Sequence, residues 1–473
     1  MEGLETGLRL GNKQLSTVDC VAQSLAVGPV FSAALLGSIL AGLTGGVGPF
    51  TLILTLIGIL GIGWTVSEFA KRYAGSGTVY EFIEKSLGQR AAVFTAGSYY
   101  LGVLALTAVG IPLVGGMLIH AFLNNHMGIG VPWWIWSLVV LGIITLVNNL
   151  GVEMSVRTQL VVIVLSLIPF AVLAMKVIID GGVAGNNLDS FNPANVAEGG
   201  SVFKGLLFAI LMFVGFELAA ALGEETANPK RSIPRAVMAT ILIVFSVYVV
   251  TQYALAIGSD GDTIPPFFEV MAEVYVGRWL LFWIEIAIML DMLAVGIGFA
   301  LAGARGMFTL SRDGLLPASL SKLNSRSQPV NGNLVVLVVG IIGVFITFVV
   351  YGTEPFLDEN GVQLFPVPEK AFYALLICST IGAMIICTTY VLLCLGALKT
   401  FATKRPIDLI AAVLGLGIAV LGIAAQFIEG TAPTDDAKWG VWIAVACLVI
   451  AGVWTALSRK EAVAKVGQHT LTH

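Results

Sequence analysis

Three carboxyl groups lie well inside long apolar stretches of the sequence, away from their ends, where ionisable side chains are rare. Glu217 follows Gly215 and Phe216 in one stretch, and Glu285 and Asp291 share another. A charge at membrane depth is costly unless the group is protonated or paired. We therefore predict that Glu217, Asp291 and Glu285 are candidate proton-binding groups. Hydrogen bonding within the protein is the alternative for Glu217 and Asp291.

Glu285 and Asp291 occupy different positions on their helix. They are six residues apart, which corresponds to roughly 9 Å along a helix and a turn of about 120°. The two side chains therefore cannot face one point. We expect Glu285 near the outer end of the helix and Asp291 near mid-membrane, where Asp291 is the stronger candidate for binding a cation, a proton or the amine of a substrate.

Two apolar stretches contain residues that interrupt helices. Gly28 and Pro29 lie inside the first stretch, and proline both removes a helical hydrogen bond and clashes with the preceding turn. In the sixth stretch, Gly215 stands two residues before Glu217. These positions predict broken helices whose freed backbone groups can bind a solute. Packing kinks are the alternative.

The elements that carry these residues are long apolar runs. The 473 residues are 57% hydrophobic and 11% charged, against roughly 25% charged in a soluble domain, so lipid must be the solvent for most of the surface. Runs of about 20 apolar residues can cross about 30 Å of hydrocarbon. They predict an all-α membrane protein with twelve transmembrane helices. The runs cover residues 18–42, 48–70, 91–123, 133–148, 156–179, 203–223, 235–257, 279–307, 333–351, 371–397, 407–428 and 439–457.

The predicted spans form two groups of five, followed by two more. Five is an odd number, so a second five-span copy enters the membrane from the opposite face, which predicts an inverted repeat with broken helices one and six. With the N-terminus inside, 20 of the 25 basic residues lie on the cytoplasmic side, as the positive-inside rule expects. We assign residues 1–17 to a cytoplasmic N-terminus, 18–179 to the first repeat, 203–397 to the second, 407–457 to two additional spans and 458–473 to a cytoplasmic tail.

Polar segments at the ends of the spans carry a resemblance to a known family. They run from Gly215 to Arg235, from Gly303 to Pro317 and from Gly151 to Gln159, with a weaker fourth from Gly77 to Gly88. Together they resemble the amino acid-polyamine-organocation superfamily of permeases. The resemblance implies a five-plus-five inverted-repeat fold of the LeuT type, with substrate held between spans one, three, six, eight and ten.

The resemblance also implies which groups bind the substrate. Its carboxylate is expected on amides of the broken first span, and its ammonium group near carbonyls of spans one and six, because helix ends carry the matching partial charges. The predicted substrate-binding residues are Ala26, Val27, Gly28, Pro29, Phe31, Ser32, Phe213, Gly215, Phe216 and Asp291. In the loops, Glu224, Asn228, Arg231, Arg305 and Arg312 are expected to form an inner gate or charge network.

The chain departs from the family pattern at two places. Gly28-Pro29, with Ser32 nearby, stands in place of the Gly-Ser-Gly-like motif of many members. Ser166 stands where many proton-coupled members have a lysine in span five.

The sequence contains no residue pattern typical of a membrane enzyme or of an ATP-driven pump. The four histidines lie at span ends, in a loop or in the tail, and no Gly-x4-Gly-Lys segment occurs. The five cysteines lie in spans without metal-type spacing. We predict no enzyme activity, no metal or other cofactor and no nucleic-acid partner. A channel is an alternative that saturable uptake with counterflow would separate from a transporter.

The predicted function is a secondary active transporter that moves amino acids across the cytoplasmic membrane by alternating access. We expect coupling to protons, with sodium left open as the coupling ion, and membrane lipid as the surrounding partner. Both termini are expected in the cytoplasm. One alternative is a transporter of polyamines or other organic cations, which Asp291, Glu285 and Glu217 support. A second alternative is an amino-acid exchanger.

Overall fold

A computed structural model describes most of the chain as a bundle of helices. The described residues are 15–74, 79–150, 152–260, 267–355, 370–428, 435–458, 460–463, 466 and 471–472. Within them, twelve helical segments are long and apolar enough to cross a membrane. This confirms the predicted all-helical architecture with twelve candidate spans.

Three of the spans consist of more than one helical segment. Span one contains α2 (Thr17–Ser24), α3 (Pro29–Phe31) and α4 (Gly37–Leu43), span three contains α7 (Gln89–Leu104) and α8 (Ile111–Met127), and span six contains α11 (Val202–Phe213) and a 3-10 segment at Phe216–Leu222. The other spans are α5 (Gly48–Ala70), α9 (Trp133–Leu150), α10 (Val152–Asp180), α12 (Pro229–Gly258), α14 (Arg278–Arg312), α15 (Val330–Tyr351), α16 (Phe372–Thr400), α17 (Pro406–Ala424) and α18 (Asp435–Leu457).

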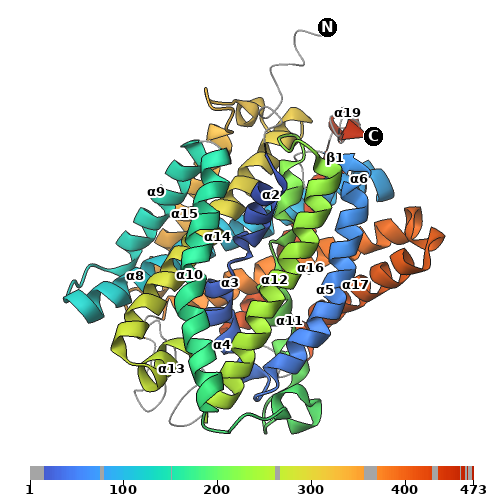
Figure 1. Cartoon of the computed structure of the whole chain (residues 1–473). Coiled ribbons are helices and arrows are strands. Elements are labelled where there is room, and N and C mark those ends of the chain that lie inside the picture. Colours follow the sequence, from blue (N-terminus) through green and yellow to red (C-terminus); the bar gives the residue numbers. More distant parts are fainter. Residues whose placement is uncertain are drawn as a thin grey trace.

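Short elements lie between and after the spans. They are α6 (Val79–Leu87), α13 (Phe268–Tyr275), α19 (Lys460–Val463) and the strand β1 (Tyr73–Ala74), which pairs antiparallel with β2 (Leu471–Thr472). α6, β1 and α19 lie at one end of the bundle, and α13 lies at the other end (Figure 1). These two ends are called the α6 end and the α13 end below.

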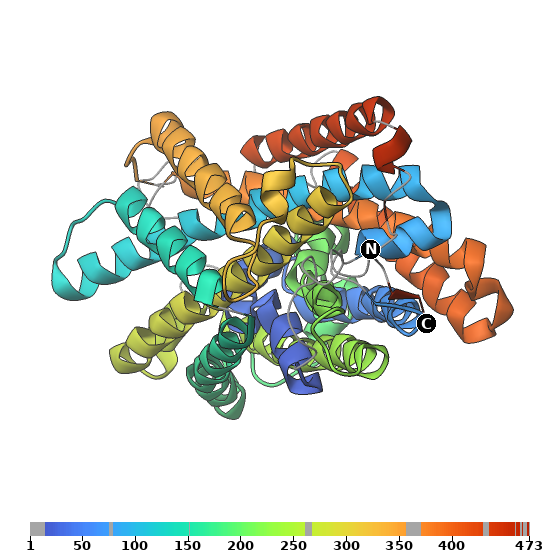
Figure 2. The same cartoon turned by 90° about the horizontal axis from the view of Figure 1, so that it is seen from above.

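Spans one and six lie at the centre of the bundle. The most apolar window of span six is 100% buried within the protein and that of span one is 94% buried, compared with 22% for spans nine and twelve. Seen from above, α17 and α18 lie at the edge of the bundle (Figure 2). The backbone around the two central spans is therefore sheltered from lipid by other helices, which is where membrane proteins tolerate irregular backbone.

The helix of span one stops at Ser24 and starts again at Pro29. A 3-10 turn follows Ser24, and Gly28 then has φ 68° and ψ 72°, a left-handed conformation that costs little without a Cβ atom. Pro29 opens the next helical segment, where its missing N–H needs no partner. A Cβ on Gly28 would lie 2.2 Å from Val295 Cγ2, so the close approach of α14 also requires glycine here.

Span six changes its backbone at Gly215. α11 ends at Phe213, and Gly215 has φ 120° before the chain continues as a 3-10 segment. A Cβ on Gly215 would lie 3.1 Å from the Cα of Val27. The interruptions of spans one and six are therefore in direct contact, although they are far apart in the sequence.

Candidate functional site

An apolar cavity adjoins the two interruptions. Its empty space, including the part open to the surroundings, is about 500 Å³. Its polar side chains are the serines Ser32 and Ser379, and no acidic or basic side chain of the described residues lines it. The lining residues are Val27, Phe31, Ser32, Leu35, Leu36, Leu106, Ile111, Leu211, Val214, Val295, Phe299, Leu375 and Ser379. The cavity therefore suits a small solute with an apolar body.

Asp291 of α14 binds the first amides of the resumed helix in span one. Its Oδ2 accepts the N–H of Val30 at 2.8 Å and the N–H of Phe31 at 2.7 Å, and the side chain is fully buried. The first N–H groups of a helix have no partner within it, and lipid offers none. The carboxylate satisfies both donors and lies at the positive end of the helix dipole.

The remaining backbone donors at this interruption are also satisfied or absent. The N–H of Gly28 donates to the carbonyl of Leu25 at 3.1 Å, Pro29 has no N–H, and the N–H of Ser32 donates to the carbonyl of Gly28 at 2.8 Å. The hydroxyl of Ser32 donates to the carbonyl of Val27 at 2.8 Å. From Gly28 to Ser32, span one therefore offers no open N–H group.

Glu217 has a similar role at the interruption of span six. Its Oε2 accepts the N–H of Gly215 at 3.1 Å, and the hydroxyl of Tyr99 on α7 donates to its Oε1 at 3.4 Å. Tyr390 on α16 interacts with the same carboxyl group, which is fully buried. Glu217 therefore joins the interrupted span to spans three and ten.

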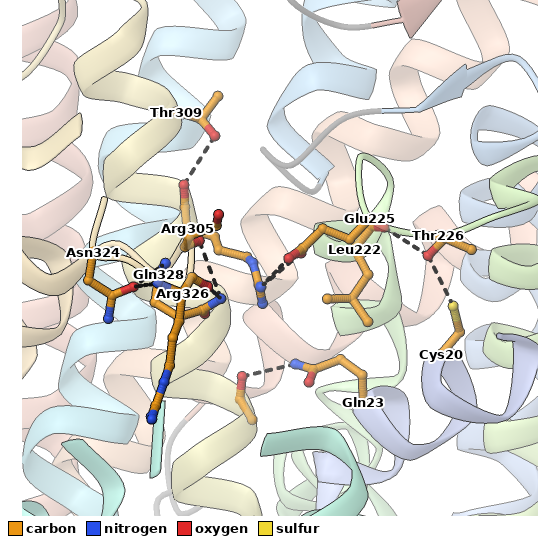
Figure 3. A network of polar contacts seen from close by, with 12 residues as sticks. Cys20, Gln23, Leu222, Glu225, Thr226, Arg305, Thr309, Asn324, Arg326 and Gln328 are labelled. Carbon is orange, nitrogen blue, oxygen red and sulfur yellow. Dashed lines mark hydrogen bonds and ion pairs between the residues drawn. The ribbon is translucent and has the colours of Figure 1, made fainter. Parts of the chain in front are cut away.

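Two ion pairs connect the α6 ends of spans six and eight. Arg305 Nη2 lies 2.8 Å from Glu225 Oε2, and the two side chains are at most 2% exposed. Arg312 Nη2 lies 2.9 Å from Glu224 Oε1. Figure 3 shows Arg305 and Glu225 facing each other. Burial raises the pKa of the Glu225 carboxyl, and the positive charge of Arg305 opposes this effect. The cavity and these ion pairs lie on opposite sides of the interruptions. The cavity residues of span one run from the interruption through Ser32 toward α4, away from the α6 end.

Glu285 lies away from the cavity, at the α13 end of α14. Its Oε2 is 2.6 Å from Nε2 of His126, which is near the end of α8. Glu269 of α13 is close by, and burial together with the charge of Glu285 raises the pKa of Glu269 to about 7. Glu285 therefore belongs to a group of three titratable side chains at the α13 end.

With this geometry established, comparison with known sequences gives the family. The profile of the amino acid permease family matches residues 20–453. The chain belongs to this family. It has the architecture of a multi-pass membrane protein, the family is one of transporters and not of enzymes, and the predicted superfamily is confirmed.

Relatives of the permease bear names that refer to amino acids and amines. It is 26% identical over 287 residues to the branched-chain amino acid permease BcaP of Bacillus subtilis (strain 168), covering 55% of this chain and 59% of the relative. It is 26% identical over 292 residues to the low-affinity putrescine importer PlaP of Escherichia coli (strain K12), covering 59% of this chain and 63% of the relative. These matches span about three fifths of each relative's length.

The predicted substrate-binding residues occupy different places around the cavity of the permease. Val27, Phe31 and Ser32 line it. Gly28 and Pro29 shape the interruption of span one, and Gly215 shapes that of span six, while Asp291 bonds the backbone beside the cavity wall. Ala26 packs against the backbone of α14 at Gly298.

The two predicted phenylalanines of span six do not line the cavity. Phe213 packs edge-on against Tyr248 with ring centroids 5.4 Å apart, and Phe216 stacks on Tyr390 at 5.9 Å. Both phenylalanines are fully buried and absent from the lining. Their positions indicate packing around the interruption.

Most of the apolar lining of the cavity was not predicted from the sequence. Val295 and Phe299 follow Asp291 at intervals of four residues, which places them on the same face of a helix. This spacing is a usable signal. Leu211, Val214 and the lining residues of spans three and ten carry no comparable signal, because apolar residues occur throughout those spans.

Proposed function

We propose that this permease is a secondary active transporter that moves amino acids or closely related amines across the cytoplasmic membrane by alternating access. The observation that carries the proposal is the apolar cavity at the contact between the interruptions of spans one and six. Interrupted central helices supply polar backbone groups beside an otherwise apolar site, which suits a small solute with a polar head. Alternating access requires a state that is closed at one end of the bundle. Ion pairs at the α6 end, with the cavity on the other side of the interruptions, fit such a state.

The proposal includes the five-plus-five inverted repeat of the LeuT type. Residues 18–179 would form the first repeat and 203–397 the second, with the two spans of 407–457 outside them. The interruptions then occupy matching positions in the two repeats. The excess of basic residues in the predicted inner segments supports cytoplasmic termini, so the α6 end would face the cytoplasm.

We further propose that protons drive the transport. Asp291 and Glu217 each accept backbone N–H groups of an interrupted helix while fully buried. Protonation removes the negative charge that holds those amides, so each interruption becomes freer to rearrange when its carboxyl group binds a proton. This links proton binding to the conformational step. Glu285 is the less direct candidate because it pairs with His126 at the α13 end, away from both interruptions.

The uptake of labelled solutes into liposomes tests this function. Purified protein is reconstituted and offered a panel of amino acids and polyamines, with an inward proton gradient, a sodium gradient or no gradient. The proposal predicts accumulation of at least one solute that requires the proton gradient. Accumulation driven by sodium alone would refute proton coupling, exchange only against internal solute would identify an exchanger, and no uptake of any solute would refute the substrate class.

A further inference from the structure

The interruption of span one presents no open N–H donor to a ligand. The N–H groups of Val30 and Phe31 are bonded to Asp291, and the other donors from Gly28 to Ser32 are bonded within the span or absent. The carboxylate of Asp291 thus occupies the place where an anionic ligand group would bind the start of a helix. A ligand carboxylate would have to displace Asp291 and leave its buried charge without these two bonds.

The second carboxylate oxygen of Asp291 has no hydrogen-bond partner in the part of the chain that the structure describes. Oδ1 is buried and takes part in no hydrogen bond with any described residue, whereas Oδ2 accepts two N–H groups. The interactions of the side chain are those with the backbone of Val30 and Phe31, and an electrostatic one with the ring hydroxyl of Tyr248. A buried carboxylate with an unused oxygen is stabilised by a cationic partner.

Asp291 lies directly beside the cavity. On α14 it is followed at four-residue intervals by Val295 and Phe299, which line the cavity. On span one it bonds the N–H of Phe31, whose side chain also lines the cavity. A cationic head group that reaches Oδ1 therefore places its hydrocarbon part against apolar walls.

We propose that the solute of this permease is an apolar primary monoamine without a carboxylate, bound with its ammonium group at Asp291 and its hydrocarbon body in the cavity. The second ammonium group of a diamine would face hydrocarbon, because no acidic side chain of the described residues lines the cavity. The inference rests on the proposed function and narrows its substrate class from amino acids and amines to monoamines.

Calorimetric binding to the purified full-length protein in detergent tests the inference. The ligands are 3-methylbutylamine, L-leucine and L-leucinamide, which share one hydrocarbon body. L-leucinamide keeps the shape of L-leucine without its negative charge. We expect 3-methylbutylamine and L-leucinamide to bind at least tenfold more tightly than L-leucine at pH 7. Binding is measured instead of uptake because free amines cross bilayers unaided.

Variants assign the ammonium contact. Asp291→Asn should weaken 3-methylbutylamine binding at least tenfold, whereas Asp180→Asn, at an exposed ion pair with Lys176, should leave it unchanged. If Asp291→Asn fails to fold, the affinities of the three ligands for the unaltered protein still test whether the solute is a monoamine. The inference is overturned if L-leucine binds as tightly as the amine, and the proposed function then stands. Failure of all three ligands to bind also overturns the monoamine inference. If, in addition, no solute of the uptake panel enters the liposomes, the proposed transport function is refuted as well.

Discussion

Asp291 and Glu217 both accept main-chain N–H groups that an interrupted helix leaves without partners. Asp291 reaches span one from α14, whereas Glu217 bonds Gly215 within its own span. Buried away from water, such amides need a partner within the protein, so each carboxyl group stabilises its interruption. The same bonds would respond to protonation. One residue at each interruption can therefore combine a structural role with a role in coupling.

Gly28 should not tolerate even the smallest side chain. Gly28→Ala places a Cβ 2.2 Å from Val295 Cγ2 and forces alanine to adopt φ 68°, a strain of order 1–3 kcal/mol before the clash is counted. We expect at least a tenfold loss of uptake and a lower melting temperature in detergent. Gly142→Ala, where a Cβ meets nothing within 4 Å, is the matched control. Normal uptake by Gly28→Ala would show that α14 does not constrain the interruption.

Glu269 should make stability depend on pH. Its pKa of about 7 lies above its ordinary value, so the folded protein holds an extra proton between these two values and loses stability as pH rises through this window. We expect the free energy of unfolding to fall by on the order of 1 kcal/mol from pH 6 to pH 8. Glu269→Gln should flatten the dependence of melting temperature on pH, and Glu273→Gln, at an exposed ion pair, should not.

Single residues of the candidate site were predictable where their chemistry is unusual for their surroundings. Asp291 stands out as a carboxyl in an apolar run, and Gly28-Pro29 as a helix breaker, and both lie at the interruption. The partner of Asp291 was not predictable, since a contact between spans one and eight depends on three-dimensional packing. Ser379 was missed for a similar reason: a serine in a span has many packing roles.

At the scale of elements, span six depends on hydrogen bonds that join it to its neighbours. Glu217→Ala would leave the N–H of Gly215 and the hydroxyl of Tyr99 without this acceptor, and each unsatisfied buried group costs about 1–3 kcal/mol. Glu217→Gln keeps an acceptor oxygen and should cost less. We expect melting temperatures in the order wild type, Glu217→Gln, Glu217→Ala, with exposed Glu198→Ala unchanged as the control. Equal temperatures for all four would contradict this role.

The spans themselves were predictable because their length and apolarity are set by the bilayer. The run at 18–42 corresponds to a span at Thr17–Leu43, and the run at 439–457 to one at Lys438–Leu457. What apolarity could not give is the local geometry. The 3-10 turn that follows Ser24 packs against α14 and span six, and the π turn that follows Phe31 packs against α11 of span six.

At the scale of the whole molecule, the ion pair of Arg305 and Glu225 should hold the α6 end closed. Cys20 reports on this closure, because it is fully buried and its sulfur lies 3.4 Å from the hydroxyl of Thr226. In a variant that keeps Cys20 as its single cysteine, Glu225→Gln should raise the rate of maleimide labelling at least threefold. The substitution leaves Arg305 without its charged partner, so the α6 end should open more often and expose Cys20.

A second ion pair provides the control for this labelling experiment. Glu354→Gln breaks an exposed pair with Lys370 elsewhere in the molecule and should leave the labelling of Cys20 unchanged. An unchanged rate in Glu225→Gln would mean that the pair of Arg305 and Glu225 does not control access from the α6 end.

In the proposed function, solute passes through the cavity between the interruptions of spans one and six. The most direct test is proton-driven solute uptake into liposomes by Ser379→Phe, which fills the cavity from α16, compared with Ser246→Phe on the exposed face of α12. We predict that Ser379→Phe loses at least nine tenths of the uptake while Ser246→Phe retains it, with both proteins folded. Undiminished uptake by folded Ser379→Phe would contradict the claim.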